Sequence, residues 1–211
     1  MPDRRGNGGA AVTTGPWPLT EAQEGIWYAQ AQAPGSAAFN TGQVLWIDGP
    51  LDRAALSRAV ARICTEAQAL SLRFGLRDGR PMQWLGKPPA LSLREVGSEA
   101  ALRGALWDEA LTPFDLARGP TARLSLWRLS DGRHALSQCL HHLAADGYAN
   151  TLITRRIAQH YAHETGQGPQ PGTMAPFLRV IDADRAFRAD PARAQMAAWW
   201  HARLRDLPPI T

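Results

Sequence analysis

The residues best suited to chemistry lie in one short turn, HHLAADG, at positions 141–147. An imidazole titrates close to neutral pH, so a histidine can take a proton from an amine, hydroxyl or thiol that attacks a carbonyl carbon. His141 and His142 end an apolar run typical of a strand, and strand alternation sends them to opposite faces. The sequence therefore predicts that one histidine faces a cleft and its neighbour packs beneath.

Asp146 and Gly147 close this turn just before a helical pattern begins at Tyr148. Asp146 follows His142 closely enough for the turn to curl back, so that its carboxylate can fix the loop or the surroundings of the ring. Gly147 permits a positive φ angle or the close approach of a ligand to the backbone. No serine stands where a nucleophile is expected, and attack on an activated thioester needs none. A general base is the role that these residue types favour.

Two other interpretations of the histidines stay open at this point. A histidine pair at a strand end often has a structural role only, and spacing alone favours that role over catalysis. A metal site is disfavoured, because adjacent strand residues diverge and no further ligand stands at a convincing spacing. His160 and His163 share a predicted helix but bracket no third ligand, so we expect both at the surface.

Composition bounds the class of protein. The chain has 211 residues, 45% of them hydrophobic and 20% charged, which indicates a globular domain with a sizeable core. No apolar run has the length of a membrane span or signal peptide, so we expect a cytoplasmic protein without a membrane partner. Cys64 and Cys139 lie in apolar elements and are interpreted as buried thiols. The arginines behind the net charge of +4 are scattered, so no nucleic-acid partner is expected.

Helices and hairpins alternate along the chain and must position the turn. Thr20 and Gln23 form a capping box at the first helix, which carries Ile26 and Trp27. Further helices are predicted from Asp52, from Ser98, over 148–165, and as two helices after the Pro/Gly-rich stretch 166–176, the second beginning at Asp190-Pro191. Strands are predicted at 41–49, 70–85, 90–96 and 121–140, and the second and last of these contain hairpin turns.

The two hairpins fix the fold class. Asp78-Gly79 and Asp131-Gly132 are strong turn signals, and in the first hairpin Leu70, Leu72 and Phe74 alternate with polar residues. The second hairpin delivers the chain to His141. The sequence therefore predicts an α/β domain with a mixed, largely antiparallel sheet packed with helices. Neither a P-loop nor a G-x-G-x-x-G follows a strand, which argues against a doubly wound nucleotide fold.

The turn HHLAADG resembles the HHxxxDG signature of condensation domains in nonribosomal peptide synthetases, which belong to the chloramphenicol acetyltransferase-like superfamily. PLTEAQEGIWYAQ, EAQALSLRFGLRDGRPMQWL and PFDLARGPTARLSLWRL resemble further family segments in the family's order. The likeness is greatest to enterobactin-type siderophore synthetases. It runs from about residue 17 to the end of the chain, where AAWWHARLRDLPP resembles the segment that leaves the first lobe. Several motifs in the correct order are more specific than one.

The resemblance implies the N-terminal lobe of a V-shaped, two-lobed acyltransferase that forms an amide bond. A donor acyl thioester and an acceptor amine would arrive on the phosphopantetheine arms of peptidyl, aryl or acyl carrier proteins, with no cofactor bound directly. His142 matches the histidine expected at the reacting centre, as a general base or as a group that orients the amine. His141 and Asp146 would be structural, the aspartate turned from substrate and held by an arginine, and Gly147 would lie along the channel.

Two departures accompany the resemblance. The family usually has Leu-Arg where this chain has Leu70-Ser71, so Asp146 lacks its usual partner; either another arginine substitutes or the turn is looser. The resemblance also implies a second lobe and downstream adenylation and carrier domains, which these 211 residues do not include. We expect a flexible leader at 1–16, the lobe at 17–174 and a helical segment at 175–211 leading towards the missing lobe. Such a lobe alone is expected to be inactive.

Two alternatives remain. An epimerization domain of the same superfamily carries the same signature, but such a domain follows a carrier domain, whereas a Met1-initiated leader precedes the first helix here. A non-catalytic module that docks carrier proteins is the other, motivated by Ser71 and the short chain.

Overall fold

The computed structural model describes residues 14–206, and the predicted leader at 1–16 lies mostly outside them. A four-stranded sheet forms the centre of the molecule, with the strand order β2-β7-β6-β5. Its strands are β2 (Asn40–Ile47), β5 (Leu91–Val96), β6 (Ala122–Leu129) and β7 (His134–His141). Only β5 and β6 pair in parallel; β7 pairs antiparallel with both neighbours. The predicted mixed, largely antiparallel sheet is confirmed.

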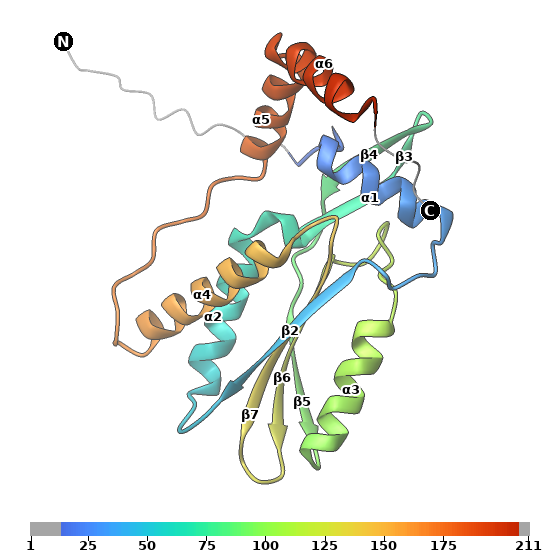
Figure 1. Ribbon diagram of the computed structural model, residues 1–211. Coiled ribbons are helices and arrows are strands. Elements are labelled where there is room, and N and C mark those ends of the chain that lie inside the picture. The colour runs from blue at the N-terminus through green and yellow to red at the C-terminus, as the bar shows by residue number, and fades with distance from the viewer. Residues whose placement is uncertain (1–13, 207–211) are drawn as a thin grey trace, which may run out of the picture.

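A smaller three-stranded sheet, in the order β1-β4-β3, extends from one end of the first (Figure 1). It consists of β1 (Trp17–Pro18), β3 (Leu72–Arg77) and β4 (Arg80–Leu85). The predicted hairpin at Asp78-Gly79 joins β3 to β4, and both turn residues adopt positive φ angles. Thr14 lies beside β4, because its carbonyl accepts a hydrogen bond from the Leu85 amide.

Six α-helices and one 3-10 helix surround the sheets in the described part of the chain. Three helices begin with the capping side chains that the sequence predicts. Thr20, Asp52 and Ser98 each accept a hydrogen bond from a backbone amide of the first turn, and Gln23 completes the capping box with Thr20. The helices are α1 (Glu21–Gln32), α2 (Arg53–Glu66), η1 (Gln68–Ser71), α3 (Glu99–Leu111), α4 (Gly147–Glu164), α5 (Leu178–Ala189) and α6 (Ala192–Leu204).

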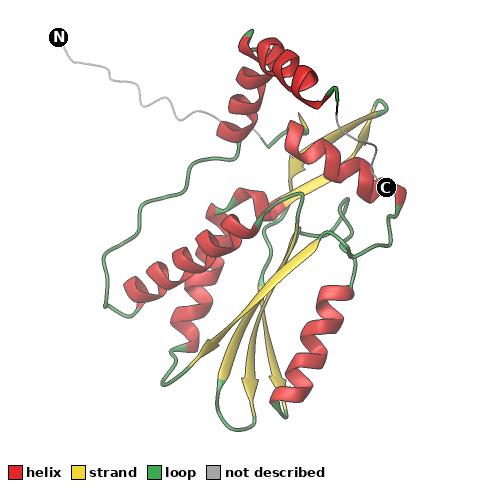
Figure 2. Cartoon of the chain, in the orientation of Figure 1, coloured by secondary structure: helices red, strands yellow, loops and turns green. Residues whose placement is uncertain are grey.

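The helices cover both faces of the central sheet (Figure 2). Helices α2 and α4 pack on one face, where Val60, Ile63 and Ile157 meet Leu136 and Leu140 in the largest apolar cluster. Helix α3 packs on the other face through Leu102, which contacts Trp127. Along β7, even-numbered residues therefore face α2 and α4, while odd-numbered residues face α3. This alternation decides where the two histidines of the turn point.

Helix α5 packs beside α1 and the smaller sheet, whereas α6 has no buried residue. Ile181 of α5 is 2% exposed and joins Trp17 and Leu19 in a second apolar cluster. In α6 the apolar side chains are all largely exposed, among them Trp199 and Trp200, whose rings meet edge to face. Beyond residue 174, α5 thus packs on the rest of the molecule, whereas the apolar side chains of α6 are exposed.

Two local features differ from what the sequence pattern suggests. Leu70, Leu72 and Phe74 alternate with polar residues, yet residues 70–74 are all buried, because η1 interrupts the alternation and Arg73 donates hydrogen bonds to the backbone carbonyls of Ser71, Leu72, Lys87 and Arg118. His160 was expected at the surface and is instead 5% exposed beside Glu66, while His163 is exposed as predicted.

No helix within residues 14–206 is long and apolar enough to cross a membrane.

Candidate active site

The backbone holds the HHLAADG turn on both sides of the sheet end. The amide of His141 donates to the carbonyl of Thr121 at 2.9 Å, and the amide of His142 donates to the carbonyl of Phe39 at 2.8 Å. The Ala144 amide then bonds the carbonyl of His141 at 2.9 Å, which closes the turn. The turn is therefore fixed by main-chain hydrogen bonds to two flanking segments before any side chain contributes.

His141 is a buried, neutral structural residue. Its side chain is 1% exposed and stands between the rings of Phe39 and Phe114. The ring Nδ1 accepts a hydrogen bond from the Leu143 amide at 3.1 Å, so Nε2 carries the proton that it donates to Gln30 Oε1, also at 3.1 Å. Burial, followed by the nearby His142, lowers the pKa of His141 to about 4. At neutral pH the ring is uncharged and has both nitrogens occupied.

The side chain of His142 lies on the opposite face of the sheet from that of His141. It is an exposed residue on the face of the sheet that carries α4, and it lines a cavity at the start of that helix. Within residues 14–206 no side-chain hydrogen bond engages its ring, so its nitrogens remain available to a substrate. The two adjacent histidines thus divide the duties as strand alternation predicts: one is pinned beneath the turn and the other faces open space.

Asp146 and Gly147 form the start of α4. Asp146 Oδ1 accepts a hydrogen bond from the Ala149 amide at 2.8 Å, so the carboxylate caps the helix. Asp146 borders the cavity, and the arginine partner implied by the resemblance is not found among residues 14–206, where Asp146 forms no ion pair. Gly147 does not adopt the positive φ that the sequence allows; it opens the helix, with open space around its Cα.

The cavity beside His142 has a volume of about 490 Å³. It lies between the N-terminal part of α1, the end of α2 with η1, the start of α4, and the connection that leads into α5. Leu70, Leu143 and Ile153, each almost fully buried, contribute to its lining. A site of this size is typical for a small molecule or part of one.

Two glutamines of α1 hold the turn, and sequence reasoning assigned Gln23 to the capping box alone and missed Gln30. Gln23 and Gln30 are the only buried residues of this helix. Gln23 Nε2 donates to the carbonyl of Leu143 at 2.9 Å, and Gln30 accepts the bond from His141 described above. Their seven-residue spacing places them on one face of the helix, and that spacing is the signal that could have identified them. The predicted apolar residues Ile26 and Trp27 are only partly buried.

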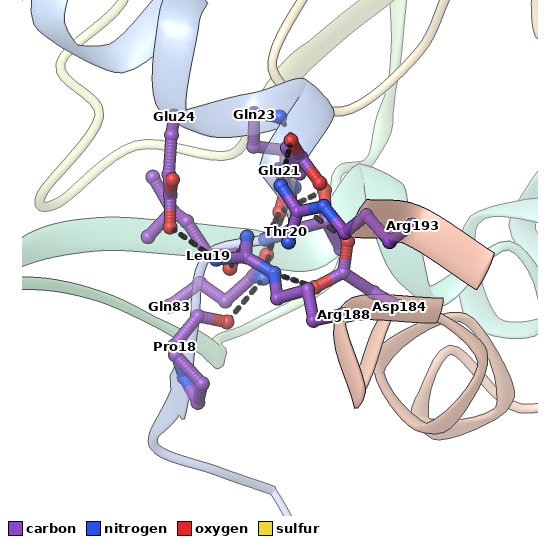
Figure 3. Close-up of polar contacts among 10 residues, drawn as sticks. All are labelled: Pro18, Leu19, Thr20, Glu21, Gln23, Glu24, Gln83, Asp184, Arg188 and Arg193. Carbon is purple, nitrogen blue, oxygen red and sulfur yellow. Dashed lines mark hydrogen bonds and ion pairs between the residues drawn. The ribbon is translucent and has the colours of Figure 1, made fainter. Parts of the chain in front are cut away.

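Gln23 is itself fixed by a buried polar network (Figure 3). Its side-chain amide exchanges two hydrogen bonds with that of Gln83, at 2.9 and 2.7 Å, and its Oε1 also accepts the Thr20 amide. Helix α5 holds the same end of α1: Asp184 accepts the Glu21 amide, and Arg188 bonds Glu24 and the Leu19 carbonyl. The position of the turn therefore depends on α1, β4 and α5 together.

A second polar cluster stands between α2 and α4. Glu66 accepts hydrogen bonds from Arg62 and Arg156, and His160 Nε2 lies 3.4 Å from its carboxylate. Burial alone would raise the pKa of Glu66, but the two arginines and His160 outweigh burial and lower it. Arg156 also donates to the Gly172 carbonyl, which fastens the 165–177 connection against α4.

Comparison with known proteins agrees with this geometry. The family model described as the condensation domain matches residues 14–211. The chain is 31% identical over 202 residues to isonitrile lipopeptide synthase of Streptomyces coeruleorubidus, covering 92% of the chain and 14% of that protein. It is 30% identical over 203 residues to enterobactin synthase component F of Escherichia coli K12, covering 91% of the chain and 16% of that protein. The chain therefore belongs to the condensation domain family.

Solved structures give the same assignment. The starter condensation domain of rhizomide synthetase RzmA superposes with a TM-score of 0.83 at 26% identity, over 92% of this chain and 49% of that one. The first condensation domain of the calcium-dependent antibiotic synthetase, in complex with a substrate analogue, superposes with a TM-score of 0.81 at 27% identity, over 93% and 50%. The chain thus spans about half of each solved domain, and the fold predicted from the resemblance, a condensation-domain lobe, is confirmed.

Proposed function

We propose that this chain is the N-terminal lobe of a domain that joins a carrier-bound donor acyl thioester to a carrier-bound acceptor amine. The observation that carries the proposal is the contrast between the two histidines. His141 is buried and has both ring nitrogens occupied, whereas His142 borders a cavity and no side-chain hydrogen bond from residues 14–206 engages its ring. Only His142 can meet a substrate, and membership of the condensation domain family supports amide formation as the reaction.

The chemistry moves one proton from the amine to the departing sulfur and requires no covalent enzyme intermediate. The amine nitrogen attacks the thioester carbonyl carbon, a C–N bond forms, and the C–S bond breaks to release a pantetheine thiolate. His142 orients the amine and accepts its proton, which is returned to the departing sulfur, so that the products are an amide and a free thiol. Orienting two tethered reactants lowers the barrier in addition to any base catalysis.

The proposed partners are peptidyl, aryl or acyl carrier proteins that present both substrates on phosphopantetheine arms. A second lobe would supply the other side of the reaction channel, and the exposed apolar side chains of α6 mark the segment that leads towards it. Downstream adenylation and carrier domains would load the acceptor. On this proposal the 211-residue chain folds but does not catalyse condensation by itself.

The test is a condensation assay on the intact synthetase that contains this chain, with loaded donor and acceptor carriers. His142→Ala should lower the rate of amide formation by about a hundredfold to ten-thousandfold, the usual contribution of a general base. His163→Ala, which removes an exposed histidine from α4, should leave the rate unchanged. Equal rates for wild type and His142→Ala, or His142-dependent condensation by the 211-residue chain alone, would contradict the proposal.

A further inference from the structure

We infer that a pocket at the opposite end of the central sheet from the HHLAADG turn binds a phosphate-type oxyanion, either free phosphate or the phosphate group of a small metabolite. The pocket has a volume of about 260 Å³ and lies where β7 begins, at His134, whereas the turn follows the other end of β7, at His141 (Figure 1). The rise of the strand separates the two ends by roughly 23 Å. The inference is therefore independent of the proposed function.

The floor of the pocket is a row of side chains across the sheet. Arg128 of β6 pairs with His134 of β7, and Glu95 of β5 pairs with Arg128. Such cross-strand partners project from the same face of a sheet. His134 shares its face with Leu136, which lies in one apolar cluster with residues of α2. Arg53, the first residue of α2, therefore borders the pocket from the helix that covers this face.

His134 is a partly buried histidine without hydrogen-bond partners. Both of its ring nitrogens are shielded from water, and neither has a partner among the residues that the structure describes. A polar group inside a protein normally has a partner, because the loss of its hydration otherwise costs free energy. Since the ring borders the pocket, an oxyanion bound there would accept a hydrogen bond from it and supply the missing partner.

The arginines around the pocket favour an anion. Arg53 forms no ion pair with residues 14–206, so its guanidinium is available to a ligand. Arg128 pairs with Glu95 at 3.5 Å, but both side chains are more than half exposed, and such a pair is weak in water. Burial, and then the charges of Arg53 and Arg128, lower the pKa of His134, so both guanidinium groups lie close enough to act on the ring. Guanidinium groups bind phosphate-type oxyanions through paired N–H donors.

Two other charged residues near the pocket are engaged elsewhere. Arg94 borders the pocket, but its side chain belongs to the other face of β5, where the guanidinium carbon lies 5.1 Å from the ring centroid of Trp127. The carboxylate of Asp52 is occupied as the cap of α2. Glu95 is therefore the acidic group that a bound anion would meet, and the two arginines and the histidine outnumber it.

The experiment follows the ring signals of His134 by NMR in the labelled 211-residue chain. Inorganic phosphate should shift these signals with a dissociation constant on the order of 1 mM. Methyl phosphate distinguishes the two sources of the ligand: binding as tight as that of phosphate supports a phosphorylated metabolite, whereas rejection of the ester supports free phosphate. Sodium chloride at the same ionic strength should leave the signals in place.

Three variants at exposed positions locate the site. Arg53→Gln removes a guanidinium from the pocket and should weaken phosphate binding about tenfold. Glu95→Gln removes the opposing charge and should strengthen binding about threefold, a gain that damage to the fold would not produce. Arg155→Gln removes an arginine from α4, outside the pocket, and should leave binding unchanged. Circular dichroism checks that each variant is folded.

The pH dependence of sulfate binding tests the part of the ring, because sulfate keeps its charge between pH 8 and pH 6. Of the charged groups that face the pocket, Arg53, Arg128 and Glu95 also keep theirs over this range, so His134 is the group that titrates. An anion beside the ring favours its protonated form and raises its pKa. Sulfate should therefore bind about fivefold more tightly at pH 6 than at pH 8, and His134→Asn should remove this preference.

Several results would overturn the inference. They are phosphate binding that leaves the His134 signals unmoved, a response that chloride reproduces, equal weakening by Arg53→Gln and Arg155→Gln, and weaker binding after Glu95→Gln. None of these measurements uses amide formation, so the failure of this inference leaves the proposed function intact, and an inactive synthetase leaves the anion site to be decided by NMR.

Discussion

Acidification should destabilise the folded chain through His141, and the structure gives the size of the effect. Burial lowers the pKa of this ring to about 4, against 6.5 for an exposed histidine. Between these values the unfolded chain binds the proton and the folded chain does not, so stability is complete above pH 6.5 and falls as the pH drops towards 4. The free energy of unfolding should therefore fall by about 2 kcal/mol between pH 8 and pH 5. The total loss, reached below pH 4, is on the order of 3 kcal/mol.

Urea unfolding of the 211-residue chain at a series of pH values measures this loss directly. His141→Gln removes the titrating group, so its stability should depend less on pH between 8 and 5 than that of wild type, by about 2 kcal/mol. His163→Gln should keep the wild-type dependence, because that side chain is exposed. Burial also lowers the pKa of His134, which adds a background of the same sign to every variant.

If His141→Gln fails to fold, an NMR pH titration of the wild-type protein tests the same prediction. The imidazole signals of His141 in the wild-type protein should stay those of a neutral ring, protonated on Nε2, down to about pH 5. A ring that titrates near pH 6.5 would refute the argument, as would a wild-type stability that is the same at pH 8 and pH 5.

Two further stability predictions concern groups that hold the turn. Gln23→Met removes hydrogen-bond partners from the Leu143 carbonyl, the Gln83 side chain and the Thr20 amide, so the free energy of unfolding should fall by about 3 kcal/mol or more. Gln32→Met, on the exposed face of α1, should change it little. A common urea midpoint for both variants would contradict the network. Asp146→Ala removes the cap of α4 and should cost about 1 kcal/mol; no loss of stability by thermal unfolding would show that the cap is not formed.

The sequence predicts the framework of this molecule because local chemistry determines much of it. The capping side chains at three helices and the Asp-Gly turns of both hairpins act within a few residues, and all are confirmed. Alternation along β7 likewise places His141 and His142 on opposite faces, and the apolar run before them correctly predicts a buried strand.

What the sequence does not predict are the polar groups that tertiary contacts bury. Gln30 looks like a surface residue until His141 becomes its partner, 111 positions away. His160 is buried because Glu66 and Arg156 of the α2–α4 interface surround it, and Arg73 because four backbone carbonyls accept its bonds. Pattern alone assigns such residues to solvent, since burial of a polar side chain depends on partners that are distant in the sequence.

The central claim is that the ring of His142 faces the space in which an amine meets the donor acyl group. A crystal structure of the intact domain with hexanoyl-pantetheine bound tests it most directly. We predict the thioester carbonyl beside His142, with room for an amine within about 3 Å of a ring nitrogen. A thioester bound away from His142, or a second lobe that seals this ring from any approaching pantetheine arm, would contradict the account.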